Sequence, residues 1–299
     1  MGSPLLHQQI RKAPPRGSPA QPFRRMRRPQ ERVQLLGGTM DLVKSSEVFH
    51  FAAGKIAANK PALVANHNLH SLYLLKRDSE LRSFFRMADL VEVDSIPLIL
   101  WARLVGRRSR RFHRCTYLDW RDEFWATAER NGWRVYFVGG QSGVAEIAAD
   151  KIRSQWPGVR LKSHHGYFDV TDGSSENERV IDEINRFSPN VLLVGMGMPR
   201  QEAWIVRNYE KLPACVTFTV GGAFDYEAGV QLPCPRWAGQ LGVEWLFRLL
   251  TNPKLLSRYA IEPWSLMGPA LADLMSAARR RVNSILAMKA ANTFPRSFK

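Results

Sequence analysis

Two kinds of apolar pattern alternate between residues 33 and 229. Short, nearly continuous apolar runs are typical of buried strands, whereas apolar residues three and four positions apart are typical of amphipathic helices. The first kind predicts strands at 61–66, 89–95, 133–140 and 159–168, and at the start of 191–205 and of 214–229. The second kind predicts helices at 69–88, 97–106, 122–132, 144–156 and 176–187, and from Pro199 onward. Buried strands that alternate with helices predict an α/β fold with a parallel sheet covered on both faces.

The pattern changes after residue 235, where no further strand is predicted. Six apolar residues there recur at helical spacing: Leu271, Leu274, Met275, Ala278, Val282 and Ile285. Such a helix either packs on the core or lies on a membrane surface, with Trp264 at the interface and arginines on anionic lipid. We favour the membrane surface, because the basic excess of the chain is otherwise hard to explain.

The net charge of +16 predicts an anionic partner, which is nucleic acid, an anionic membrane surface or a phosphorylated ligand. Basic residues are concentrated in three segments: residues 1–32, Arg107–Arg111 and Arg279–Arg281. In the first of these, Glu31 is the single acid. We therefore divide the chain into a disordered basic tail (1–32), an α/β core (33–235) and a helical, membrane-associating appendage (236–299).

Several classes of protein are excluded by what the sequence lacks. Cys115, Cys215 and Cys234 are scattered, which favours neither a disulfide framework nor a zinc site and is consistent with a reducing cytosol. No apolar run approaches the ~18 residues that a membrane span needs, and the N-terminus has no apolar segment of a secretory signal. The chain has no Walker A loop and no G-x-S-x-G motif, and Arg200 stands where a dinucleotide fingerprint needs its third glycine. No recognised nucleic-acid-binding motif is present.

Three predicted strands end in glycine pairs. The stretch "VLLVGMGMPRQEAWI" (191–205) joins such a strand to a helix, and this is either a tight turn or a phosphate site at the helix N-terminus. Parallel strands bind ligands at their carboxyl ends, so three such ends on one edge favour a phosphate-bearing ligand. The glycines are Gly139, Gly140, Gly195, Gly197, Gly221 and Gly222.

Polar residues also gather at the predicted strand ends: Asn66, His67, Asn68, Asp94, Arg114, Asp119, Gln201, Glu202 and Asp225. Asp94 directly follows the strand "LVEV", which suits a general base. Its alternative role is to cap the helix that starts near Pro97. The acidic pair in "DYE" (225–227) suggests either a metal site or a hydrogen-bonded turn, and we favour the turn.

Four ordered motifs, "FVGGQSGVAE", "VGMGMPRQEAWI", "VGGAFDYEAG" and "GVEWLFRLL", resemble the WecG/TagA/CpsF glycosyltransferase family. The resemblance covers about residues 33–260. It implies a Rossmann-like core with a basic C-terminal appendage. It also implies inverting, metal- and cofactor-independent transfer from a UDP-sugar to a sugar-diphosphopolyprenol, by a cytoplasmic protein peripheral on the inner face of the cell membrane.

The family's motifs carry roles to matching positions of this chain. The catalytic group is expected to be Asp94, Asn66 and Arg114, with Asp119 as the next candidate for the base. The UDP-sugar-binding residues are expected to be Gly139, Gly140, Gly195, Gly197, Gln201, Glu202, Gly221, Gly222 and Asp225. Arg248, Lys254 and Arg258 of the appendage are expected to bind the acceptor or a diphosphate.

The chain departs from the family at Val64 and Ser95, where the family has Thr and Gly, and at "PCP" (233–235). "ANHNLHSLYLL", "VDSIPLI" and "HRCTYLDW" resemble instead the branch that makes xanthan- and acetan-type polysaccharides. That branch adds glucose β-1,4 to glucose-diphosphopolyprenol, which is the donor and acceptor that we expect. An N-acetylmannosaminyltransferase acting on GlcNAc-diphosphoundecaprenol is the alternative within the family. A non-enzymatic basic adaptor for lipid or nucleic acid is the alternative from another class. We expect no nucleic-acid partner; the oligomeric state stays open, with a homo-oligomer as one option.

Overall fold

The computed structural model describes residues 31–231, 246, 249 and 256–293, and of residues 257, 258 and 290–293 the backbone alone. The structural statements below concern these residues. The predicted tail (1–32) lies outside them except for its last two residues, because the small hairpin of β1 (Arg32–Leu35) and β2 (Gly38–Asp41) begins at Arg32. The predicted boundary at 235 lies outside them as well.

The predicted parallel sheet is confirmed. Its six strands are β3 (Ala62–His67), β4 (Leu90–Val93), β5 (Arg134–Gly139), β6 (Arg160–His164), β7 (Val191–Gly195) and β8 (Val216–Thr219). They lie in the order β4-β3-β8-β7-β5-β6, and every neighbouring pair is parallel. The carboxyl ends of all six strands therefore lie along one edge.

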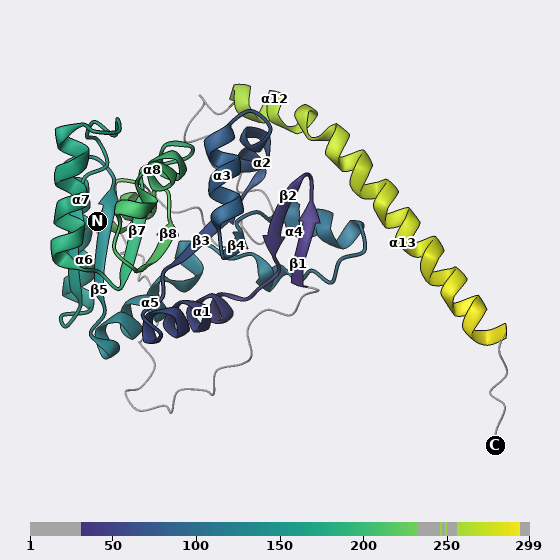
Figure 1. Ribbon diagram of the computed structural model, residues 1–299, viewed down its shortest axis with the longest axis horizontal. Helices are drawn as coiled ribbons and strands as arrows, with labels where there is room; N and C mark the ends of the chain where they lie inside the picture. Colours follow the sequence, from purple (N-terminus) through teal and green to yellow (C-terminus); the bar gives the residue numbers. More distant parts are fainter. Residues whose placement is uncertain (1–30, 232–245, 247–248, 250–255, 294–299) are drawn as a thin grey trace, which may run out of the picture.

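Helices cover both faces of the sheet, as the apolar strands require. One face packs on α1 (Ser45–Ala57), α5 (Tyr117–Asn131), α6 (Val144–Gln155) and α9 (Ala223–Ala228). The other packs on the hairpin and on α2 (Leu69–Leu75), α3 (Ser79–Met87), α4 (Ile96–Leu104), α7 (Ser175–Phe187), α8 (Arg200–Asn208) and α13 (Met267–Thr293). The described helix α12 (Leu256–Ser265) lies against α2. Figure 1 shows α13 leaving this body as a long helix whose far end points away from it.

Four predicted elements differ from the structure. The helix predicted at 69–88 is two helices, because the side chain of Asp78 accepts a hydrogen bond from Leu81 N (3.0 Å) and starts α3. Helix α5 begins at Tyr117 rather than at 122, after the cap formed by Thr116 and Asp119. Strand β6 ends at His164 rather than at 168. The glycine-rich exit of β8 continues into α9, so Asp225 lies in a helix rather than in a turn.

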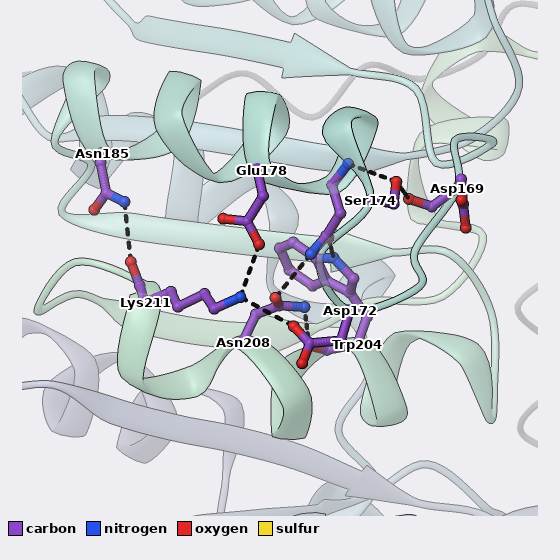
Figure 2. Close-up of polar contacts among 9 residues, drawn as sticks. Asp169, Asp172, Ser174, Glu178, Asn185, Trp204, Asn208 and Lys211 are labelled. Atoms are coloured by element: carbon purple, nitrogen blue, oxygen red, sulfur yellow. Dashed lines mark hydrogen bonds and ion pairs between the residues drawn. The ribbon is translucent and has the colours of Figure 1, made fainter.

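Polar contacts fix α8, which carries two predicted site residues, against α7. Figure 2 shows these contacts, in which Trp204 Nε1 donates to Asn177 Oδ1 (2.8 Å) and Asn177 Nδ2 donates to Asn208 Oδ1 (3.0 Å). Lys211, in the short 3-10 helix η3 (Tyr209–Lys211), pairs with Glu178 of α7 at 2.7 Å. These contacts hold the second half of α8, and the segment that follows it, against α7.

Candidate active site

The direction in which the strand order advances reverses between β5 and β7. From β5 the chain passes to β6 on one side, and from β7 it passes to β8 on the other side. A reversal of this kind is the usual ligand-binding position of an open α/β sheet. Gly139 and Gly195 are register partners directly at this point.

These two glycines have a packing role. A Cβ on Gly139 would lie 2.3 Å from Gly195 O, and a Cβ on Gly195 would lie 2.6 Å from Gly221 O. The exits of β5, β7 and β8 therefore touch through their backbones, which no larger residue permits. Gly197 (φ +80°) and Gly221 (φ +52°) differ, because a Cβ on either would meet nothing within 4 Å. Their backbone is therefore the part of the glycine exits that a ligand can approach.

Asp225 lies at the meeting point of two of these exits. Its carboxylate oxygens lie 3.8 Å from the position of a Cβ on Gly140 and 3.1 Å from that on Gly222. Burial raises the pKa of Asp225. The residue therefore faces the glycine-rich turns of β5 and β8, close to a predicted UDP-sugar.

Gln201 and Glu202 occupy the first turn of α8, as expected from the sequence. Gln201 Nε2 donates to Glu202 Oε1 (2.7 Å), and Gln201 Oε1 accepts from Gly221 N (3.2 Å). Burial raises the pKa of Glu202 to about 7, and its Oε2 is buried without a hydrogen-bond partner in the described part of the chain. Gln201 thus ties α8 to the β8 exit.

The three predicted catalytic residues lie on the neighbouring strands. Asn66 Nδ2 donates to Thr219 O (2.9 Å), which joins the ends of β3 and β8. Asp94 directly follows β4, and its Oδ1 lies 3.9 Å from an Arg114 guanidinium nitrogen. Arg114 follows the 3-10 helix η2 (Arg111–His113) and pairs with Val93 of β4 through an isolated bridge.

The structure separates the two candidate bases. Helix α4 begins at Ile96 with Ser95 at its N-cap position, so Asp94 is not the N-cap residue of that helix. Asp119 does act as a cap, because its Oδ2 accepts from Thr116 N (3.2 Å) and Thr116 Oγ1 (3.0 Å). Asp94 is therefore the better placed of the two to take a proton.

His67 and Asn68 serve the fold. Asn68 caps α2, because its Oδ1 accepts from Ser71 N (2.9 Å). His67 is fully buried and stacked on Phe85, and burial lowers its pKa to about 3, so the ring is neutral. These strand-end residues position α2 rather than a ligand.

One further acid lies beside the site, and the sequence analysis missed it. Glu92 is only 3% exposed, although it stands in the middle of the apolar strand β4. Burial raises its pKa to about 8. A lone acid in an otherwise apolar buried strand is the signal that identifies it.

The predicted diphosphate-binding residues are not placed. Arg248 and Lys254 lie outside the described residues, and Arg258 lies in α12 without a described side chain. Within the described ranges, no group of three or more His, Cys, Asp or Glu is arranged to hold a metal ion. No helix there is both long and apolar enough to cross a bilayer.

A parallel sheet with polar groups gathered at its topological reversal defines a doubly wound α/β protein with a ligand site at the carboxyl edge. The glycosyl transferase model of the WecG/TagA/CpsF family matches residues 33–280, and the chain belongs to this family, as its motifs predicted. It is similar to the N-acetylglucosaminyldiphosphoundecaprenol N-acetyl-beta-D-mannosaminyltransferases of Staphylococcus aureus strains NCTC 8325 / PS 47 and COL. Each is 32% identical over 146 residues, which are 49% of this chain and 56% of the relative. The chain thus spans about half the length of the curated relatives it matches.

Proposed function

We propose that this protein is an inverting glycosyltransferase that moves a sugar from a UDP-sugar to a sugar-diphosphopolyprenol. Membership of the family supports the reaction class. The observation that carries the proposal is the convergence of Asp94, Arg114 and Asn66 with the glycine exits on one edge of the sheet. A basic adaptor for lipid or nucleic acid needs no such edge.

The relatives favour a particular donor and acceptor. Their names describe transfer of N-acetylmannosamine to N-acetylglucosaminyl-diphosphoundecaprenol, which was the alternative within the family rather than our first expectation. We propose this pair as the first to test. Glucose transfer to glucose-diphosphopolyprenol, for exopolysaccharide synthesis, stays a prediction from the motifs of the acceptor side.

In the proposed reaction the acceptor hydroxyl attacks the anomeric carbon from the face opposite UDP. Asp94 takes the hydroxyl proton, and the bond from the anomeric carbon to the UDP oxygen breaks with its electron pair on the leaving diphosphate. A positioned base contributes roughly 10²–10⁴-fold to such a step. Arg114, together with the appendage residues Arg248, Lys254 and Arg258, stabilises the diphosphate charge electrostatically.

In this proposal the nucleotide lies at the carboxyl ends of β5 and β7, where the strand order reverses. The open backbone of Gly197 and Gly221 allows close approach, and the start of α8 presents N–H groups to a phosphate. Glu202 Oε2 and Asp225 then face the uridine or its sugar.

The described part of the appendage supports contact with an anionic membrane surface. Helix α13 faces the body through Asp273, whose Oδ2 accepts from Leu36 N and Trp101 Nε1, through the buried Ala277, and through Arg280. Because a helix turns once in 3.6 residues, the apolar stripe lies on the far side of α13. Its exposed members Leu271, Leu274, Met275, Val282 and Ile285 retain 42% to 59% of their surface.

An apolar stripe that the described residues leave exposed beside Arg279 and Arg281 suits the headgroup region of a bilayer. The exposed residues of the stripe do not pack on the described core, whereas Ala277 of the same helix does. We therefore place the protein on the inner face of the cell membrane, where the lipid-linked acceptor lies.

The test is transfer by the purified full chain with two donors, UDP-N-acetylmannosamine and UDP-glucose, each offered with both lipid-linked acceptors. We expect product from one matched pair and a rise in melting temperature with UDP. Stabilisation by DNA but not by UDP, with no product from any pair, would show the adaptor class instead.

A further inference from the structure

Glu92 lies directly behind the proposed catalytic group. In the parallel pair of β3 and β4 its register partner is Asn66, so the two side chains leave the same face of the sheet. Asp94 follows Glu92 by two residues, and side chains two positions apart along a strand share a face. The buried carboxyl group of Glu92 thus precedes the proposed base on the same face.

Contacts tie Glu92 to the segment that carries Arg114. Cys115 Sγ donates to Glu92 Oε1 (3.0 Å), and Cys115 N donates to Val93 O (2.9 Å). The thiol is fully buried. The neighbouring Arg114 lies 3.9 Å from Asp94 and 3.7 Å from Asp119. Glu92 therefore helps to hold the segment of Cys115, from which the guanidinium of Arg114 reaches Asp94 and Asp119.

We propose, on the basis of the function proposed above, that Glu92 is a positioning residue for the transfer, and that it holds Arg114 against Asp94 through Cys115. Removing the acceptor oxygen of Glu92 frees the segment, whereas removing only its charge does not. Arg114 then loses its fixed place beside Asp94, and transfer slows although UDP still binds.

Glu92 also gives the site an upper pH limit. The titratable groups around it are Asp94 at the end of β4, Cys115 after η2 and Asp119 of α5. Arg114 lies beside the two aspartates. Burial raises the pKa of Glu92 to about 8, the Cys115 hydrogen bond opposes this, and Asp94 and Asp119 raise it further. The group is therefore neutral at pH 7. Above about pH 8 Glu92 becomes a third carboxylate beside Asp94 and Asp119.

Two substitutions separate the acceptor oxygen from the charge. Glu92→Gln keeps an oxygen for the thiol and removes the charge, and we expect kcat within about threefold of wild type at pH 7 without the decline above pH 8. Glu92→Leu keeps the volume and removes the oxygen, and we expect kcat at least tenfold lower with an unchanged Kd for UDP. Wild-type kcat in a folded Glu92→Leu, or an unaltered pH profile in Glu92→Gln, overturns the proposal.

Cys115 gives an independent pair of variants should Glu92→Leu not fold. Cys115→Ser keeps the donor and should retain activity, whereas Cys115→Ala should lose it as Glu92→Leu does. Equal kcat in the two overturns the proposal. The matched control is Glu183→Gln on α7, an acid that accepts from Tyr136 (3.1 Å) away from this group, and it should change neither kcat nor the pH profile.

A measurement without transfer distinguishes failure of this proposal from failure of the proposed function. In ¹³C-carboxyl NMR titrations, with Asp94 assigned by comparison with Asp94→Asn, we expect the Asp94 signal to show an inflection near pH 8 that disappears in Glu92→Gln. An Asp94 signal that does not sense Glu92 overturns the proposal whether or not the wild type transfers sugar. Absence of product from the wild type counts against the proposed function alone.

Discussion

At the scale of single residues, three neighbouring acids have three environments. Asp119 is bound as the cap of α5, Glu92 is buried and neutral at pH 7, and Asp94 lies at the strand end, 27% exposed and 3.9 Å from Arg114. Arg114 lies beside both aspartates, 3.9 Å from Asp94 and 3.7 Å from Asp119, but Asp119 also accepts two hydrogen bonds from Thr116. The division of roles follows from burial and hydrogen bonding rather than from residue type.

Asp94→Asn should lower kcat by about 10² or more and leave UDP binding unchanged. The substitution preserves size and removes the basic oxygen, and the melting temperature should change little because Asp94 is not at the N-cap position of α4. Steady-state kinetics and UDP titration check this. Wild-type turnover in a folded Asp94→Asn would remove Asp94 from the mechanism.

At the scale of elements, α13 has two faces with different partners. The face with Asp273 and Arg280 binds the body, because Arg280 donates to Val105 O (3.1 Å) at the end of α4. The opposite face carries the apolar stripe. Helix α4, which Arg280 contacts at its end, also exposes Leu100 and Leu104. A variant aimed at the membrane must therefore spare Arg280.

Replacing Arg279 and Arg281 by Glu should release the protein from anionic vesicles at ~0.15 M salt. Each basic residue near such a surface contributes roughly 1 kcal/mol, and each reversal adds repulsion. Co-sedimentation with vesicles measures the effect. The matched control reverses Arg160 of β6 and Arg179 of α7, which are both exposed. Figure 1 shows α7 on the side of the body away from α13. Equal binding of both variants would remove the membrane role of α13.

At the scale of the whole molecule, three buried ionisable groups make stability depend on pH. The pKa of His67 falls to about 3 on burial, so its contribution rises with pH up to the unfolded value of 6.5. The pKa values of Glu92 and Glu202 rise to about 8 and about 7, so the folded state binds more protons than the unfolded state above pH 4.5. Their contribution to stability therefore falls as pH increases.

Between pH 6.5 and 8 the two acids dominate, and stability should decrease. Glu92 alone accounts for about 1–2 kcal/mol over this interval, since one pKa unit corresponds to about 1.4 kcal/mol. Glu92→Gln should remove that part and show a shallower fall of melting temperature with pH. A thermal-unfolding series of both proteins checks this. Parallel curves would show that Glu92 does not titrate in the folded state.

Deletion of residues 1–25 should leave transfer within about tenfold of the full chain, which corresponds to roughly 1.4 kcal/mol of transition-state stabilisation. The deleted segment lies outside both the family match and the described residues. Kinetics of the truncated protein on detergent-solubilised acceptor are the measurement. A larger loss would mean that the basic tail takes part in binding the acceptor.

The sequence by itself determined the class of fold, the family and the edge at which we propose the site. Apolar alternation is a local property, so it predicted β3–β8 and most helices, while the glycine exits and Asp94 stood at strand ends. The periodicity gave a wrong prediction where a helix cap interrupts an apolar pattern. Asp78 is such a cap, and it divides α2 from α3.

Only the tertiary structure decided which strand ends meet. The order β4-β3-β8-β7-β5-β6 sets the exits of β5, β7 and β8 against one another, and this depends on packing between segments far apart in the chain. Burial is likewise a non-local property. It made Glu92 a neutral acid behind Asp94, and it turned the apolar stripe of α13 away from the core, because Asp273 binds Leu36 N and Trp101 from the other side of the helix.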